Sequence, residues 1–209
     1  MSSGIPPLSS LTDSTVVDQA VSLLLEPSPI LHSKLTPAII ERITSNGTPE
    51  SYACLVDICA EEIGGWSLED KAAFLGGHPL IGEVKNLSAL SAKEQGGKTV
   101  KTPEIVLKRL SHLNKLYSRI YPGLPYITFV AGRPRAAIVK EMEKALALPD
   151  SPEPIPDDWN EVEQPGLDSE ETLARVKEWG GAEWQSEVER ALQDVWLIAK
   201  SRLQGLGLK

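Results

Sequence analysis

The stretch that decides the fold is residues 102–123, TPEIVLKRLSHLNKLYSRIYPG. Thr102 can cap a helix, Pro103 suits its first position, and Pro122-Gly123 stops it. Between these signals the apolar residues recur every three or four positions, which places them on one face of a helix. The residues of that face are Val106, Leu110, Leu113, Leu116 and Tyr117.

The same spacing extends outward through most of the chain, whereas alternating, strand-like runs are scarce. We therefore predict an all-helical fold, a compact single-domain helical bundle. Residues 125–130 are β-like, but they have no partner strand, so we expect either a buried extended stretch or the apolar start of a helix. The other predicted helices run from Thr12 or Asp13 to Glu26, from Pro37 to Asn46, from Thr48-Pro49 to Ile63, from Ser67 to Gly76, from Pro134 to Leu148, and from Asp168 to Leu203 with a break at Gly180-Gly181.

Length and composition predict one domain with an insertion. A chain of 209 residues buries roughly 70% of the surface that its unfolded form exposes, so it needs neither disulfides nor a structural metal to fold. We predict a flexible N-terminus over residues 1–10 and a domain over residues 11–209. Residues 149–167 are rich in proline and acidic residues, so we expect a surface excursion or a partly disordered insertion there. Cys54 and Cys59 are expected to be reduced core thiols of an intracellular protein.

The charge balance argues against whole classes of function. With 21 Lys and Arg against 29 Asp and Glu, the formal net charge is -8, so we expect no nucleic-acid partner. No apolar run approaches about 20 residues, and residues 1–10 do not resemble a secretory leader, so we expect neither a membrane protein nor a secreted one. A cytoplasmic location is the default expectation. A peroxisomal one stays open, although the chain ends in Gly207-Leu208-Lys209 instead of S-K-L.

The chain has three histidines, and one of them stands in a loop suited to chemistry. His78 follows Gly76-Gly77 and precedes Pro79, where a rigid backbone can direct an imidazole into a cleft. His32 lies in a Pro-rich connector and His112 in the helix quoted above, and structural roles suit both. His78 is therefore the first candidate for a functional residue.

Two further segments are candidates. Glu94 and Gln95 are adjacent and offer a carboxylate and an amide to a polar substrate, but Ser91 with Glu94 is also an ordinary capping box. Arg133 follows the apolar run 125–130. It would either bind a carboxylate bidentately or be a solvated charge at a helix start.

Three motifs occur in an order that resembles one family. They are the loop HPLIG at residues 78–82, the segment SAKEQ at 91–95, and the helix with its continuation at 114–126, NKLYSRIYPGLPY. They are similar to the His-Pro-x-Leu-Gly loop, the Ser-x-x-Glu-Gln segment and the Asn-x-x-Tyr helix of 2-oxo-4-hydroxy-4-carboxy-5-ureidoimidazoline (OHCU) decarboxylase. That enzyme is the last of the route from urate to allantoin. The closing residues 191–203 also resemble the family's last helix.

The chain departs from the family pattern at three places. Ile81 replaces a leucine of the loop, which is a mild change between branched aliphatic side chains of equal volume. The family's aromatic-Gly-aromatic-Pro-aromatic run is YPGLPY at residues 121–126. Family members frequently have an arginine after the apolar run. The corresponding residue here is Ala131, and Arg133 lies two residues later.

The resemblance implies a compact all-α homodimer that acts on a small-molecule substrate, the ureidoimidazoline, without metal, flavin or pyridoxal phosphate. It implies that His78 is the proton-transfer group and that Glu94 orients the substrate hydroxyl or the imidazole. Loss of carbon dioxide pushes electrons into the adjacent imine, so the protein only has to handle protons and align the carboxylate. The expected product is (S)-allantoin. The substrate-binding residues that the resemblance implies are Pro79, Ser91, Gln95, Ile127, Val130, Ala131 and Arg133.

Other functions stay open. The chain is alternatively a catalytically inactive helical binding or scaffold domain derived from this family, and the insertion and the net charge of -8 suit an interaction surface. A metal hydrolase would require His32 or His112 to meet His78 beside carboxylates. A plain all-α domain, in which the candidate residues are caps and turn formers, would be the interpretation of any one motif alone.

Overall fold

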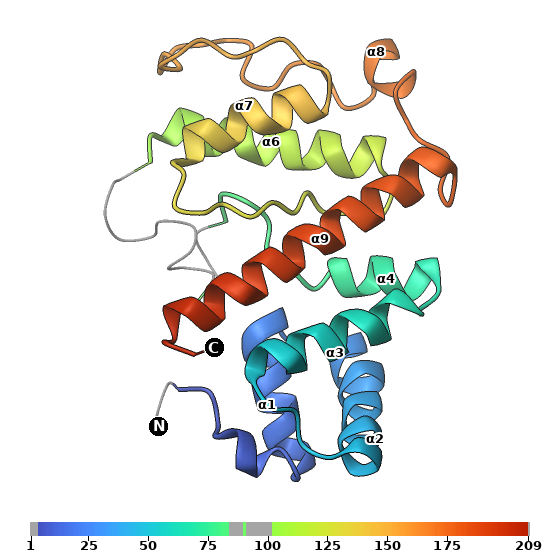
Figure 1. Cartoon of the computed structure of the whole chain (residues 1–209). Helices are drawn as coiled ribbons and strands as arrows, with labels where there is room; N and C mark the ends of the chain where they lie inside the picture. The colour runs from blue at the N-terminus through green and yellow to red at the C-terminus, as the bar shows by residue number, and fades with distance from the viewer. Residues whose placement is uncertain (1–3, 84–89, 91–101, 209) are drawn as a thin grey trace. The chain divides into compact units, whose positions relative to one another are not determined.

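The computed structural model describes residues 4–83, residue 90 and residues 102–208 of the chain. Helices joined by turns and extended segments make up these residues (Figure 1). No β-strand occurs among them, which confirms the predicted all-helical fold class. Nor does this part of the chain contain a helix that is long and apolar enough to cross a membrane.

Contacts between Cα atoms divide the chain into two compact units. The first unit consists of Met1–His78 and Glu189–Lys209, and the second unit of Pro79–Val188. Helix α9, Ala182–Gly205, contributes residues to both. The first unit is therefore assembled from two separate stretches of sequence, whereas the second is continuous.

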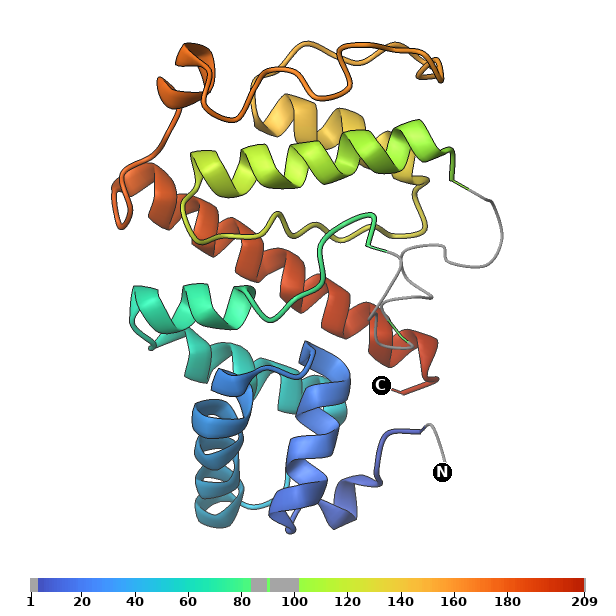
Figure 2. The same ribbon diagram turned by 180° about the vertical axis from the view of Figure 1, so that it is seen from behind.

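Four short helices and the later part of α9 form the first unit. Helix α1 packs against α2, and α2 packs against α3; α1 and α2 lie side by side in both views (Figures 1 and 2). Their inward faces carry the apolar residues expected from the spacing, among them Val17, Leu24, Ile39 and Ile43. The elements are a 3-10 turn at Leu8–Ser10, α1 at Ser14–Leu25, a π-helical turn at Leu31–Leu35, α2 at Thr36–Asn46, α3 at Tyr52–Gly64 and α4 at Leu68–Leu75.

Side-chain caps explain where two of these helices begin. Asp13 accepts hydrogen bonds from the first amides of α1, and Ser67 accepts one from the Asp70 amide of α4 at 3.2 Å. Both starts agree with the sequence prediction, with Asp13 as the cap of the two residues considered. Helix α1 ends before Glu26, which has a φ of +65°, and Pro27 follows. A positive φ and a proline both stop a helix.

Two predicted helix starts are wrong. The third helix begins not at Thr48-Pro49 but after Ser51, because the Ser51 hydroxyl accepts a hydrogen bond from the Cys54 amide at 3.1 Å. The helix expected to have Thr102 as its cap has Pro103 in that position instead and begins one residue later. The start of α3 is thus set by a side chain that satisfies a helix amide. The start of α6 is set by a proline, which has no amide of its own to satisfy.

The second unit is built around α6, the helix of the opening stretch. Helix α6 packs against α7 and α8, and α6 and α7 run side by side in both views (Figures 1 and 2). Residues 124–130 form a largely buried extended segment that pairs with no strand within the described residues. Of the two predicted alternatives, the buried extended stretch is therefore confirmed. The helices are α6 at Glu104–Ile120, α7 at Arg135–Ala145, α8 at Glu170–Leu173 and the first residues of α9.

Residues 149–167, within the second unit, contain no regular helix, but a buried charge of α6 holds them in place. Arg109 of α6 and Glu143 of α7 form an ion pair at 2.8 Å, with side chains that are 3% and 0% exposed. The guanidinium of Arg109 also donates hydrogen bonds to the carbonyl oxygens of Val162, at 3.2 Å, and Gln164, at 2.6 Å. The segment is thus held on α6 through its backbone, which no local sequence pattern revealed.

Candidate active site

His78 stands directly after α4, at the end of a turn formed by Gly76 and Gly77. Its backbone amide donates a hydrogen bond to the carbonyl oxygen of Leu75 at 3.0 Å. Its Nδ1 atom lies 3.3 Å from the carbonyl oxygen of Phe74, and its ring meets the Phe74 ring edge-on with centroids 5.2 Å apart. The residue is only 9% exposed, so its backbone and its ring are both fixed.

The turn before His78 packs directly on the segment that follows α1. A Cβ atom added to Gly77 would lie 2.5 Å from the Cβ and 3.2 Å from the Oγ of Ser28. Ser28 is itself buried, and its hydroxyl accepts a hydrogen bond from the Leu31 amide. Glycine at position 77 is therefore required for the close approach that places His78.

The surroundings of His78 decide its charge and its tautomer. Burial lowers the pKa of His78 to about 4, the positive charge of Arg202 acts in the same direction, and Glu26 opposes them. The imidazole is therefore neutral at pH 7. Because the carbonyl oxygen of Phe74 can only accept a hydrogen bond, we assign the ring proton to Nδ1. Nε2 is then a proton acceptor, and no described residue donates a hydrogen bond to it.

The loop that opens the second unit is held by Asn114 of α6. The Nδ2 atom of Asn114 donates hydrogen bonds to the carbonyl oxygens of Ile81 and Leu110, both at 2.9 Å. Gly82 has a φ of +85°, and a Cβ atom there would lie 3.0 Å from Leu110. Pro79, a predicted substrate-binding residue, begins this loop half-buried. Asn114 was not predicted as a site residue; the available signal was an amide on the apolar face of a helix.

A cavity of about 400 Å³ lies beside this loop. Its volume is in the range of small-molecule sites, and Asn114 both lines it and anchors the loop at its edge. The shape of the cavity therefore depends on that one side chain. The loop and one face of α6 supply its lining: Leu80, Ile81, Gly82, Glu83, Leu107, Ser111, Asn114, Lys115 and Ser118.

The extended segment 124–130 and the turn after it carry the remaining described residues that were predicted to bind substrate. Ile127 and Val130 are buried, and Ala131 has a φ of +51°. The backbone N–H groups of residues 128–131 donate no hydrogen bond to another described residue. Ala131 is exposed and Phe129 half-buried, so part of this stretch is open to solvent.

Arg133 forms hydrogen bonds with the segment that precedes it. Its guanidinium donates hydrogen bonds to the carbonyl oxygens of Val130, at 2.9 Å, and Phe129, at 2.7 Å, and it pairs with Glu141 of α7. Burial acts to raise the pKa of Glu141, but hydrogen bonds from Thr128 and Arg133 outweigh it and hold the pKa below its ordinary value. Arg133 thus ties the extended segment to α7, a role that the sequence did not reveal.

The second predicted motif lies outside the described residues. It comprises Glu94, the predicted partner of His78, together with Ser91 and Gln95. The three residues keep the roles that the resemblance implies for them as predictions.

The other two histidines have hydrogen-bond partners of their own. His32 contacts Asp18 through Nδ1 at 2.7 Å, and His112 contacts the carbonyl oxygen of Pro165 through Nε2 at 2.9 Å. Among the residues that the structure describes, no group of three or more His, Cys, Asp and Glu side chains is arranged to hold a metal ion. The arrangement required for a metal hydrolase is therefore not found within those residues.

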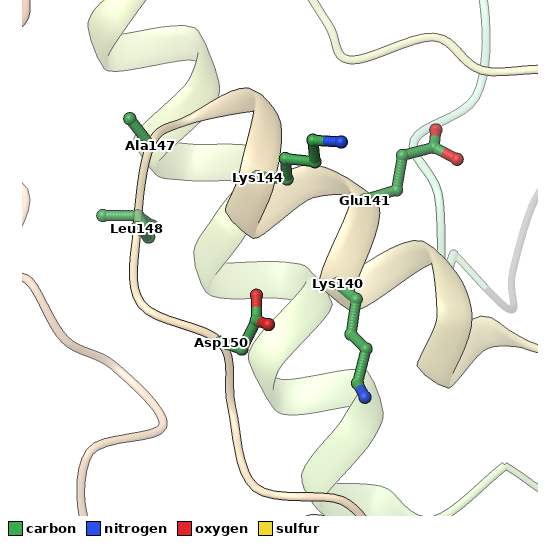
Figure 3. Close-up of a pocket in the computed structure, with 6 residues that line it drawn as sticks. All are labelled: Lys140, Glu141, Lys144, Ala147, Leu148 and Asp150. Carbon is green, nitrogen blue, oxygen red and sulfur yellow. The ribbon is translucent and has the colours of Figure 1, made fainter.

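A second cavity, of about 710 Å³, lies at the end of α7 in the second unit (Figure 3). Lys140, Glu141 and Lys144 reach it from α7, and Ala147, Leu148 and Asp150 from the chain that follows (Figure 3). Lys140 pairs with Glu153, and Glu141 is engaged as described above, so these charges serve contacts within the chain. None of the predicted site residues is among those that line this cavity.

Comparison with models of protein families identifies a match. Residues 10–154 match the family model described as OHCU decarboxylase. The matched region covers more than half of the 209 residues, includes His78 and Arg133, and ends within the 149–167 segment. A search of curated proteins found no match.

Proposed function

Because the chain belongs to the OHCU decarboxylase family, we propose that it converts 2-oxo-4-hydroxy-4-carboxy-5-ureidoimidazoline to (S)-allantoin in urate degradation, without a cofactor. The observation that carries this proposal is the buried, neutral His78 on its rigid turn. With the proton on Nδ1, the lone pair of Nε2 is free to take part in proton transfer. A neutral imidazole is the form that a proton acceptor needs at pH 7.

The reaction consists of one bond cleavage and three proton movements. The bond between the ring carbon and its carboxylate breaks, and its electron pair passes into the adjacent imine, whose nitrogen gains a proton. The hydroxyl on that ring carbon then loses a proton as it becomes a carbonyl, and the neighbouring carbon gains one, so that one proton is taken up overall as carbon dioxide leaves. In this proposal Nε2 of His78 accepts the hydroxyl proton. A positioned proton-transfer group typically contributes ~10²- to 10⁴-fold to the rate.

The remaining residues are proposed to bind and orient the substrate. Glu94 orients the hydroxyl or the imidazole, and the backbone N–H groups of residues 128–131 donate hydrogen bonds to the ring and the ureido group. Donors on one side of the ring fix the face that receives the proton, which explains a single enantiomer of the product. The side chains proposed to line the substrate are Pro79, Ser91, Gln95, Ile127, Val130, Ala131 and Arg133.

The test is a time course of circular dichroism at allantoin wavelengths, with the labile substrate generated from urate by the two preceding enzymes. The wild-type chain should give a fast one-handed signal, and His78→Asn should lower the rate by ~10²-fold or more. His32→Asn is the matched control, because His32 is largely exposed and contacts Asp18 instead. A His78→Asn protein that keeps the wild-type rate would refute the assignment of His78.

The second candidate function is an inactive binding or scaffold domain of the same family. It is favoured if the folded wild-type chain produces allantoin no faster, and no more one-handed, than the decay of the substrate without protein. The same experiment therefore separates the two functions.

A homodimeric state and a cytoplasmic location stay predictions. The first derives from the family resemblance. Analytical ultracentrifugation of the full chain tests the first: a mass of one 22.7 kDa chain at micromolar concentration would contradict it.

A further inference from the structure

A buried ion pair in the first unit joins the end of α1 to the end of α9. Arg202 and Glu26 are 2.5 Å apart, with side chains that are 3% and 6% exposed. The guanidinium of Arg202 also donates hydrogen bonds to the carbonyl oxygens of Leu23, at 3.3 Å, and Leu24, at 3.1 Å. Arg202 therefore satisfies the last carbonyls of α1, at the point where the positive φ of Glu26 turns the chain.

This turn is the support for His78. Ser28, two residues after Glu26, is the residue that the Gly77 backbone touches so closely that no Cβ fits. His78 is the next residue after Gly77 and has little freedom of its own, because its amide and its ring are both fixed. A displacement of the turn after α1 is therefore passed to the imidazole through two packed residues.

The same two side chains act on the imidazole by charge. Arg202 lowers the pKa of His78, and Glu26 raises it. The backbone hydrogen bonds with Phe74 and Leu75 also raise the pKa of His78. One charge of each sign from the pair thus acts on the imidazole.

We propose that Arg202 and Glu26 are positioning residues for His78. Their buried ion pair holds the turn after α1, and the turn Gly76-Gly77-His78 packs against that turn. The inference rests on the proposed function, in which His78 moves a proton. Arg202 lies outside the region matched by the family model, so the match itself assigns it no role. Misplacement of a catalytic group by about 1 Å costs up to ~10²-fold in rate.

The test is a titration of the His78 imidazole by NMR in the full chain, which needs no activity. Glu26→Gln should lower the pKa of His78, and Arg202→Gln should raise it. A pair that only maintains the fold would give shifts of the same sign, because loss of packing in either variant would expose the ring. Shifts of the same sign, or no shift in either variant, would overturn the proposal.

Each single variant leaves one buried charge unpaired and can therefore fail to fold. In that case a double variant tests the positioning of His78. Glu26→Gln with Arg202→Met removes both charges and the contacts with Leu23 and Leu24. It should fold, keep KM within about threefold, and lower kcat by roughly 10- to 100-fold through the displaced imidazole. An unchanged kcat would overturn the proposal.

The matched control is the buried pair of the second unit. Arg109→Met with Glu143→Gln removes a pair of the same chemistry that makes no contact with the turn after α1. It should leave the His78 titration unchanged. If the wild-type chain proves inactive, the proposed function fails while the titrations still test the positioning; if it is active and the titrations fail, only the positioning is refuted.

Discussion

At the scale of single residues, His78 differs from the other histidines in what its two ring nitrogens face. Nδ1 donates a hydrogen bond to the carbonyl oxygen of Phe74, whereas Nε2 accepts no hydrogen bond from a described residue. His32 and His112 each have a hydrogen-bond partner outside their own helix or turn, Asp18 and the Pro165 carbonyl oxygen. His78 thus keeps one ring nitrogen without a described partner, whereas the other two histidines serve contacts within the chain.

The neutral state of His78 makes stability depend on pH. The pKa of His78 is about 4 in the folded chain, against 6.5 for an ordinary histidine, so between these values the unfolded chain binds a proton that the folded one does not. The free energy of unfolding should therefore fall as pH decreases from 6.5 to 4, by roughly 3 kcal/mol for this group. Above pH 6.5 His78 should have no effect.

Urea denaturation at several pH values measures this change. Burial also lowers the pKa of His112, which acts in the same direction, so the comparison must be with His78→Asn. That variant should lose most of the slope between pH 6.5 and 4. Equal slopes in the two proteins would contradict a buried neutral His78.

Asn114 illustrates what residue patterns do and do not predict about the site. His78 was found because glycine and proline around a histidine indicate a rigid loop, which is a local signal. Asn114 holds the neighbouring loop through the carbonyl of Ile81, 33 positions away in sequence; an amide on an apolar helix face indicates a buried contact, but not which distant residue is the partner. The ion pair of Arg133 with Glu141, eight positions later, was not predicted either, because the turn between the extended segment and α7 brings the two side chains together.

At the scale of elements, the close contact between the turn after α4 and the turn after α1 is the most sensitive junction. Gly77→Ala would place a Cβ atom 2.5 Å from the Cβ of Ser28, a backbone-bound atom that cannot rotate away. We expect a loss of about 1–3 kcal/mol in the free energy of unfolding, typical of overpacking, and a lower decarboxylation rate. Thermal melting and the circular dichroism assay measure the two effects.

Gly76→Ala is the control for that change. A Cβ atom at Gly76 would approach the carbonyl oxygens of Ala72, at 3.4 Å, and Ala73, at 3.5 Å, which are ordinary van der Waals contacts. It should melt within a few degrees of the wild-type chain and keep its rate. Equal behaviour of the two alanine variants would show that the contact with Ser28 does not matter.

The helices themselves were largely predictable, because each buries one apolar face and the three- or four-residue spacing of that face is visible in the sequence. The attachment of residues 149–167 was not. It depends on Arg109, which the sequence presents as one charge within α6, and on backbone carbonyls more than 50 positions later. A buried charge is recognised only from its partners, and these are distant in sequence.

At the scale of the whole molecule, the division into a continuous and a discontinuous unit goes beyond what sequence patterns indicate. Glu26 and Arg202 are 176 positions apart, and Trp196 stacks on Phe74 with ring centroids 6.2 Å apart. Periodicity predicts that these helices exist and which faces they bury, but not which faces pack against each other. The first unit is defined by such contacts between helices that are distant in sequence.

A fragment of residues 10–154, the extent of the family-model match, should therefore fail to form the first unit. It lacks the α9 residues of that unit and leaves Glu26 buried without Arg202. Breaking a buried pair costs about 3–5 kcal/mol, a large part of the ~5–15 kcal/mol that keeps a protein folded. Thermal melting followed by far-UV circular dichroism should show no cooperative transition. Melting of the fragment within a few degrees of the full chain would contradict this.

The discontinuous first unit also has a consequence for the order of events during synthesis. The ribosome adds residues from the N-terminus onward, so α1 to α4 emerge before α6 to α9. They cannot complete their core until residues 189–205 of α9 have been made, by which time residues 79–188 are all present. The helices α1 to α4 thus complete their core after the second unit has been made, although they precede it in the chain, and until then their apolar faces lack the α9 residues that cover them.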